Sequence, residues 1–171
     1  AGNENADGSE SNNTLTLSVD TVRPTIAITS GASSLKAGET TTVTFTLSEA
    51  STDFVADDIS VTGGSIGSLT AVSEKVYRAT FTPTADSTTN GVISVGSSKF
   101  SDSAGNENAD GSESNNTLTL SVDTARPTIS DVSSSTANGS YKAGDSITIN
   151  VVFSEAVTVD TTNGTPTLEL E

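Results

Sequence analysis

The sequence contains no cysteine, histidine, methionine or tryptophan. Without histidine or cysteine, the chain has neither a Ser-His-Asp nor a Cys-His nucleophile system, and it lacks the usual ligands of zinc, haem and iron–sulfur centres. A pair of carboxylates can in principle hydrolyse a glycoside. Sugar clefts depend on aromatic platforms, however, and two tyrosines with five phenylalanines offer little for building one. We therefore expect that the protein is not an enzyme.

The absence of cysteine also excludes disulfide bonds, so stability must come from the core, from neighbouring units or from a metal. No apolar run approaches the roughly 20 residues that cross a bilayer, and we expect no membrane insertion. Basic residues are few: 7 Lys and Arg stand against 22 Asp and Glu, a net charge of −15. Such a surface repels phosphate backbones, which argues against nucleic acid as a partner.

An unchanged internal repeat divides the chain. Residues 1–21 (AGNENADGSESNNTLTLSVDT) recur at 104–124, an offset of 103 residues, and each copy leads into a joint with the sequence Arg-Pro-Thr-Ile. A period near 100 residues matches one immunoglobulin-type sandwich. We therefore expect 1–21 to be the C-terminal strand of a preceding repeat with its joint, 22–124 to be a complete module, and 125–171 to be the N-terminal part of a related module.

A second, looser repeat links the later parts of the chain. LKAGE at 35–39 resembles YKAGD at 141–145, and FTLSEA at 45–50 resembles VVFSEA at 151–156, now at an offset of 106 residues. Three residues have been inserted after the joint. The last module therefore belongs to a related but different subtype.

Alternating apolar and polar residues predict strands in the complete module. Seven short segments show this period, at residues 26–28, 42–47, 59–61, 66–72, 76–81, 93–95 and 118–122. Turns rich in Gly, Ser, Asn and Asp separate them, and no stretch has sustained helical spacing. The sequence therefore predicts an all-β fold of tandem immunoglobulin-like β-sandwich modules with about seven strands per module. Phe45, Tyr77, Phe81 and Phe100 are expected in the core.

Several segments together resemble a known family. They are the DTxRPT joint, KAGET at 36–40, FTLSE at 45–49, ADDISVTGG at 56–64 and FSDSAGN at 100–106. This combination resembles the bacterial Ig-like repeats of giant calcium-dependent RTX adhesins, which are exported by type I secretion and act in cell adhesion and biofilms. The resemblance implies an extracellular stalk on the bacterial cell surface, stiffened by calcium at or near module junctions.

Carboxylates from separate segments are candidate calcium ligands, since Ca²⁺ prefers oxygen. In an immunoglobulin sandwich, the loops after the second and sixth strands lie beside the preceding joint. We expect this arrangement to gather Asp20, Glu49, Asp57 or Asp58, and Asp102. Converging carboxylates repel each other unless a cation lies among them, and the alternative is ordinary hydrogen bonding in turns and caps. Asp123 and Glu155 would form the equivalent site of the next module.

The long loop 102–116 is a second candidate site. Asn106, Asn108 and Asp110, followed by Gly111, resemble the alternating oxygen ligands and the turn glycine of an EF-hand-like loop. The first position is Asn rather than Asp, and Glu113 comes too early to be the closing bidentate ligand. The alternative interpretation is a solvated polar loop.

Other functions are compatible with the same sequence. One is a ligand-binding module for carbohydrate, ice or a host receptor, although the outward threonines lack a regular rank. Another is an accessory domain of a secreted polysaccharide-degrading enzyme. Partners also include neighbouring modules of the same chain. In addition, residues 1–21 offer a spare last strand and 125–171 lack later strands, so head-to-tail self-association by strand exchange is possible.

Overall fold

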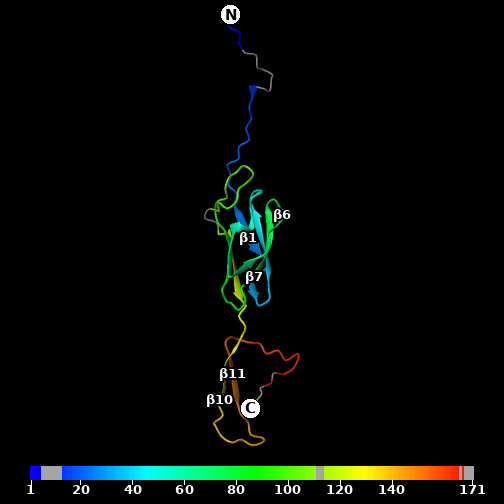
Figure 1. Ribbon diagram of the computed structural model, residues 1–171, viewed down its shortest axis with the longest axis vertical. Helices are drawn as coiled ribbons and strands as arrows, with labels where there is room; N and C mark the ends of the chain where they lie inside the picture. The colour runs from blue at the N-terminus through cyan, green and yellow to red at the C-terminus, as the bar shows by residue number, and fades with distance from the viewer. Residues whose placement is uncertain (5–12, 111–113, 166, 168–171) are drawn as a thin grey trace.

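The computed structural model describes residues 1–4, 13–110, 114–165 and 167. Figure 1 shows an extended N-terminal segment, a central β-sandwich and a small C-terminal unit that follow one another along the long axis of the molecule. The loop before β4 (Ile59–Thr62) contains a short 3₁₀ turn, η2 (Ala56–Asp58). The all-β fold predicted from the sequence is confirmed.

One sheet of the sandwich is antiparallel. It has the order β1 (Ile26–Ser30), β3 (Thr41–Leu47), β7 (Val76–Pro83) and β5 (Gly64–Ile66), and β6 (Thr70–Ser73) pairs with the other part of β7. Every second side chain of β3 is buried, as its alternating sequence predicts. The threonines between them face outward, so this sheet has one face in the core.

The second sheet has the order β2 (Ser34–Lys36), β9 (Thr117–Asp123), β8 (Gly91–Val95) and β4 (Ile59–Thr62). β2 lies parallel to β9, whereas the other pairs are antiparallel. The chain therefore changes sheet between β1 and β2. Sequence alternation missed β2 because a strand of three residues with one buried side chain, Leu35, has no period to detect.

The core lies between the two sheets. Phe45, Phe81, Ile93 and Leu120 are fully buried in it. Beside them, the Phe54 ring contacts the rings of three other aromatic residues, at centroid distances of 5.1 to 5.8 Å. The core positions predicted for Phe45, Tyr77, Phe81 and Phe100 are confirmed. Phe54 was not among them, because it lies in a loop outside any alternating segment.

Two glycines make room for the largest core side chain. A Cβ atom added at Gly64 or at Gly91 would lie 2.5 Å from Cζ of Phe81. Gly64 pairs in β5 with Pro83, and Gly91 pairs in β8 with Leu120, so the two glycines belong to different sheets. The Phe81 ring therefore fills space that both sheets leave open by lacking a side chain.

The C-terminal unit consists of β10 (Ile129–Ser134) and β11 (Ile149–Phe153), an antiparallel pair. The first residues of this unit make the same hydrogen bonds as the first residues of the sandwich. Thr128 N–H donates to Ser154 Oγ, and Ser154 N–H donates to Thr128 O, at 2.9 and 2.8 Å. Thr25 and Ser48 exchange the same two hydrogen bonds at 2.9 Å each. β10 and β11 are exposed along their whole length.

Candidate metal centre

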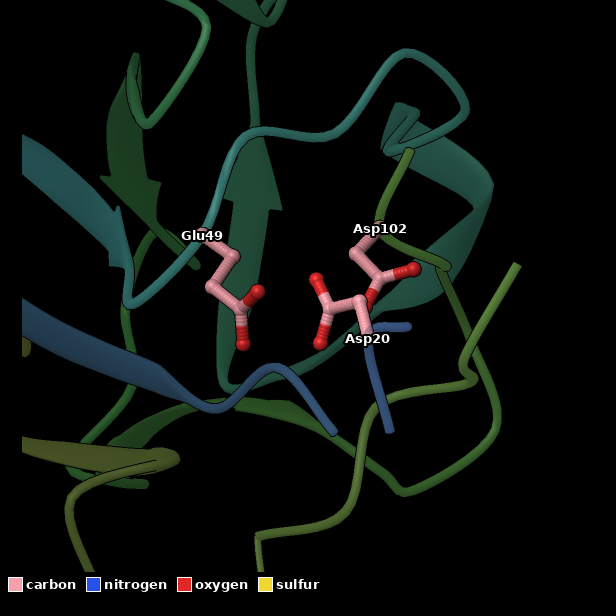
Figure 2. A group of neighbouring side chains, drawn as sticks. All are labelled: Asp20, Glu49 and Asp102. Atoms are coloured by element: carbon pink, nitrogen blue, oxygen red, sulfur yellow. The ribbon is translucent and has the colours of Figure 1, made fainter. Parts of the chain in front are cut away.

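Three acidic side chains meet at the proximal end of the sandwich, which we define as the end where residues 20–25 lead into β1. Asp20 comes from this joint, Glu49 from the turn after β3, and Asp102 from the loop after β8. One carboxylate oxygen of each residue lies within 4.8 Å of those of the other two. Figure 2 shows the three carboxylates pointing toward one another. They are the one such group of potential metal ligands in the described part of the chain.

Glu49 has an oxygen without a partner. The side chain is half-buried, and its Oε1 atom is buried and accepts no hydrogen bond. An unpaired buried polar group costs about 1–3 kcal/mol, and more if it is charged. A cation among the three carboxylates would supply the missing partner and offset their repulsion. Because every potential metal ligand in the group is a carboxylate oxygen, the group fits a hard divalent cation such as Ca²⁺.

Asp102 is held in one orientation by its own loop. Its Oδ1 atom accepts hydrogen bonds from the backbone N–H groups of Ala104 and Asn106, at 2.9 and 2.8 Å, and its Oδ2 atom accepts one of 2.9 Å from Nδ2 of Asn106. The bond from the Asn106 side chain is the main cause that holds the pKa of Asp102 below its ordinary value. The carboxylate is therefore ionised and already oriented at neutral pH.

The same loop fastens the joint to the sandwich. Nδ2 of Asn106 also donates to the carbonyl of Asp20, at 3.2 Å. Nε of Arg23 donates to the carbonyl of Glu107, at 2.8 Å, and the backbone N–H of Ala109 donates to the carbonyl of the proline in the joint, at 3.0 Å. Three hydrogen bonds thus fix the joint against its own sandwich. Protein contacts, and not an ion alone, set the position of Asp20 relative to Asp102.

Asn108 and Asp110 hold the framework of this loop. Oδ1 of Asn108 accepts hydrogen bonds from the backbone N–H groups of Lys99 and Phe100, at 2.6 and 3.2 Å. Nδ2 of Asn108 donates to Oδ2 of Asp110 at 2.9 Å, and Oδ1 of Asp110 accepts a bond of 2.7 Å from the N–H of Ile26. Both side chains are buried. The polar side-chain atoms of Asn108 and Asp110 therefore bind other protein groups. Neither residue belongs to the cluster of three carboxylates.

The remaining residues singled out from the sequence lie outside the cluster. Asp57 and Asp58 belong to η2, where Oδ2 of Asp58 accepts a bond of 2.8 Å from the N–H of Val55 and caps the turn. Asp123 ends β9 at the distal end of the sandwich, and Glu155 is exposed just after β11. In the described residues, neither Asp123 nor Glu155 belongs to a group of three potential metal ligands.

Part of the EF-hand-like pattern of the loop lies outside the residues that the structure describes. Gly111 and Glu113 lie outside the described residues. Of the three positions that are described, Asn106 binds Asp102, whereas Asn108 and Asp110 hold backbone groups.

Sequence reasoning missed Asp53, which braces the loop that carries Asp102. Its carboxylate accepts hydrogen bonds from the backbone N–H and the hydroxyl of Ser101 and from the hydroxyl of Ser51. Desolvation by burial acts to raise the pKa of Asp53, but the hydrogen bonds outweigh it and the pKa is lowered. No spacing marks this residue, because its partner Ser101 lies in another loop, 48 positions away.

Two packed sheets, one of which contains the parallel β2–β9 pair, define an immunoglobulin-like β-sandwich domain. The chain belongs to the family of bacterial Ig-like domains, whose family model matches residues 20–119. The matched segment contains all three clustered carboxylates. None of the curated proteins matches the chain in sequence.

Membership of this family supports the broad expectations drawn from the sequence. Such domains are usually extracellular or surface modules, and they are generally accessory modules without catalytic activity. No catalytic family is indicated for the chain. The described residues also include no helix of the length and apolarity needed to cross a membrane.

Proposed function

We propose that this chain is part of a structural spacer, or stalk, of a bacterial surface adhesin, and that calcium bound by Asp20, Glu49 and Asp102 stiffens it. The observation that carries the proposal is the meeting of these carboxylates, one of them with a buried, unpaired oxygen. Because Asp20 belongs to the joint and the other two to the sandwich, one ion would connect them. The connection would restrict bending of the chain where one module follows another.

The proposed array has the organisation expected from the repeat. Residues 1–21 are the last strand of one module with its joint, 22–124 are a complete module, and 125–171 begin the next. Asp123 corresponds to Asp20 in the repeat, and Glu155 corresponds to Glu49. The matching hydrogen bonds at the start of both units support the same geometry at the second junction.

The free energy that one bound calcium ion contributes is small, but the ion acts at the junction between two modules. Extracellular calcium modules have dissociation constants of about 10⁻⁴ to 10⁻³ M, so calcium at about 1 mM stabilises a site by roughly 0.4–1.4 kcal/mol. Without a cation, the repulsion among the three carboxylates opposes the hydrogen bonds that hold the joint against the sandwich. The ion therefore changes the balance between a bent and a straight junction at each module.

Small-angle scattering of the full chain tests the proposal, in millimolar calcium and again after chelation. We expect a longer, narrower distribution of interatomic distances with calcium, and no calcium response in a variant that combines Asp20→Asn, Glu49→Gln and Asp102→Asn. Calorimetric titration of the same two proteins reports binding directly. Scattering curves that do not change with calcium, together with an absence of calcium-binding heat, would refute the proposed function.

A further inference from the structure

One side-chain amide joins two of the three clustered acidic residues. Nδ2 of Asn106 donates a hydrogen bond of 2.9 Å to Oδ2 of Asp102 and another of 3.2 Å to the backbone carbonyl of Asp20. An amide NH₂ group has two N–H donors, so it can make both bonds at once. Asp102 belongs to the loop after β8, and Asp20 belongs to the joint. The Asn106 side chain therefore bridges the sandwich and the joint at the cluster.

The turn that carries Asn106 is closed by its own backbone. The N–H of Asp102 donates to the carbonyl of Asn106 at 3.1 Å, and the N–H of Gly105 donates to the carbonyl of Asp102 at 3.2 Å. Gly105 has a φ of 89°, which glycine adopts without strain. Oδ1 of Asp102 accepts two further backbone hydrogen bonds inside this turn. Backbone groups and the Asp102 carboxylate thus close the turn, and the Asn106 side chain adds the link between the turn and the joint.

The hydrogen bond from Asn106 positions Asp20 relative to the sandwich. Asp20 also makes a local hydrogen bond, because its Oδ1 atom accepts one of 3.0 Å from the N–H of Val22 in the same joint. Such a local bond fixes the shape of the joint but not its distance from the loop after β8. The bonds of Arg23 and of the proline at residue 24 hold the joint to the sandwich further along the chain. Asn106 thus acts directly at the cluster.

Without an ion, the link from Asn106 works against electrostatic repulsion. Figure 2 shows the Asp20 and Asp102 carboxylates beside each other, with Glu49 facing them. One oxygen of each residue lies within 4.8 Å of those of the other two, and negative charges at this separation repel one another. Because Asp20 is exposed and lies in the joint, it can move away more readily than the buried Asp102. The hydrogen bond from Asn106 opposes that movement.

We propose that Asn106 is a positioning residue of the cation site, which holds Asp20 beside Asp102 before an ion binds. The inference rests on the proposed function, in which calcium binds to these carboxylates. Groups that hold metal ligands in place typically contribute about 10–100-fold to metal affinity. An ion that meets two oriented ligands need not restrain the joint as well, so it binds more tightly. In this role Asn106 acts through Asp20 and Asp102, by the two hydrogen bonds from its Nδ2 atom.

Calorimetric titration with calcium compares the natural full chain with two variants, Asn106→Ala and Ser101→Ala. Asn106→Ala removes both hydrogen bonds of the bridge, and we expect the calcium dissociation constant to rise about tenfold or more. Ser101→Ala is the matched control, because the Ser101 hydroxyl lies in the same loop and donates to Asp53, away from the joint. We expect its dissociation constant to match that of the natural chain. Urea unfolding in chelator checks that both variants fold.

A second measurement follows the joint without calcium. The chain has no cysteine, so spin labels can be attached at Ser18→Cys, before the joint, and at Thr80→Cys, on the outer face of β7. Both residues are exposed. In chelator, we expect the distribution of distances between the two labels to be broader in Asn106→Ala than in the natural background or in Ser101→Ala. A role of Asn106 in the stability of its loop alone would leave the three distributions alike.

The two measurements separate failure of this inference from failure of the proposed function. If the natural chain shows no calcium-binding heat, the proposed function is refuted, and this inference with it. If the natural chain and Asn106→Ala bind calcium equally, the proposed function stands and the assigned role of Asn106 is wrong. Equal label distributions in chelator would overturn that role whatever calcium does. Weaker calcium binding together with a broader distribution, found in Asn106→Ala and not in Ser101→Ala, would support it.

Discussion

Oδ1 of Asp110 accepts a hydrogen bond of 2.7 Å from the backbone N–H of Ile26, the first residue of β1. The two residues are 84 positions apart, and both are buried. Because the other oxygen of Asp110 accepts a bond from Asn108, the loop after β8 and the start of β1 form one hydrogen-bonded unit. The proximal end of the domain therefore depends on buried polar side chains as well as on apolar packing.

Replacing Asn108 with alanine should destabilise the domain by about 2–4 kcal/mol. The substitution leaves the N–H groups of Lys99 and Phe100 without their side-chain acceptor, and Oδ2 of Asp110 without the donor from Asn108. Asn116→Ala is the control: Nδ2 of Asn116 donates a hydrogen bond to the carbonyl of Val95, and the loss of this bond should cost about 1 kcal/mol. Urea unfolding in chelator measures both values, and equal costs would contradict the assigned role of Asn108.

Glu49→Gln should have effects of opposite sign with and without calcium. In chelator, removing one of three neighbouring negative charges relieves repulsion, and we expect the free energy of unfolding to rise by a few tenths of a kcal/mol to about 1 kcal/mol. In millimolar calcium, the variant loses a ligand and should be less stable than the natural chain. Thermal unfolding in both buffers measures this reversal, with the exposed Glu74→Gln as control. An effect of one sign in both buffers would argue against a cation site.

Gly91→Ala should destabilise the sandwich, whereas Gly96→Ala should not. The new methyl group at residue 91 would meet the Phe81 ring at 2.5 Å, and overpacking of this kind costs about 1–3 kcal/mol. A methyl group at residue 96 meets nothing within 4 Å, so we expect a change below about 0.5 kcal/mol. Chemical denaturation separates the two cases. If the two variants prove equally stable, the Phe81 ring is not confined between the sheets.

Acid should weaken the domain partly through Asp53. Its pKa in the folded state lies below the ordinary value of 3.8, so its contribution to stability is complete well above pH 3.8 and is lost as the pH falls through the lowered folded pKa. Unfolding measured in chelator from pH 7 down to pH 2 should show this loss. In Asp53→Asn, the drop below pH 4 should be smaller. An unchanged pH dependence would show that the contacts with Ser101 do not favour the ionised carboxylate.

The positions of the longer strands follow from short-range patterns, but the bracing contacts of the domain do not. Alternating residues marked β3 and β7 because one face of each is buried. The predicted weak strand at 66–72 is two short strands, β5 and β6, which pair with different parts of β7. Such a division depends on the partner strand and leaves no period in the sequence. The nine strands of the central sandwich thus include short pieces that the predicted seven did not separate.

Three of the proposed ligands were found because topology alone brings them together. Asp20, Glu49 and Asp102 each follow or precede a strand at the same end of the sandwich. Asp58 is equally close to a strand, but the local 3₁₀ turn uses its carboxylate as a cap. A cap of this kind depends on the backbone of Val55. Sequence spacing could not distinguish it from a free ligand.

The alternation of Asn106, Asn108 and Asp110 has a simple structural cause. This segment is extended and forms a bridge between Glu107 and Ser101, so every second side chain turns inward. The inward side chains are polar because they meet backbone N–H groups and a carboxylate at the end of the sandwich. The same period of two appears in loops that collect ions, which explains the resemblance to an EF-hand-like pattern.

The parallel pairing of β2 with β9 has a consequence for a domain under tension. A pulling force that stretches the chain between Asp20 and Thr124 draws β9 toward the distal end and β2 toward the proximal end. Their hydrogen bonds then lie across the direction of force and must break together, in shear, instead of opening one after another. The short contact from Ser34–Ser121 to Lys36–Asp123 therefore resists such a force, together with the pairing of β1 with β3.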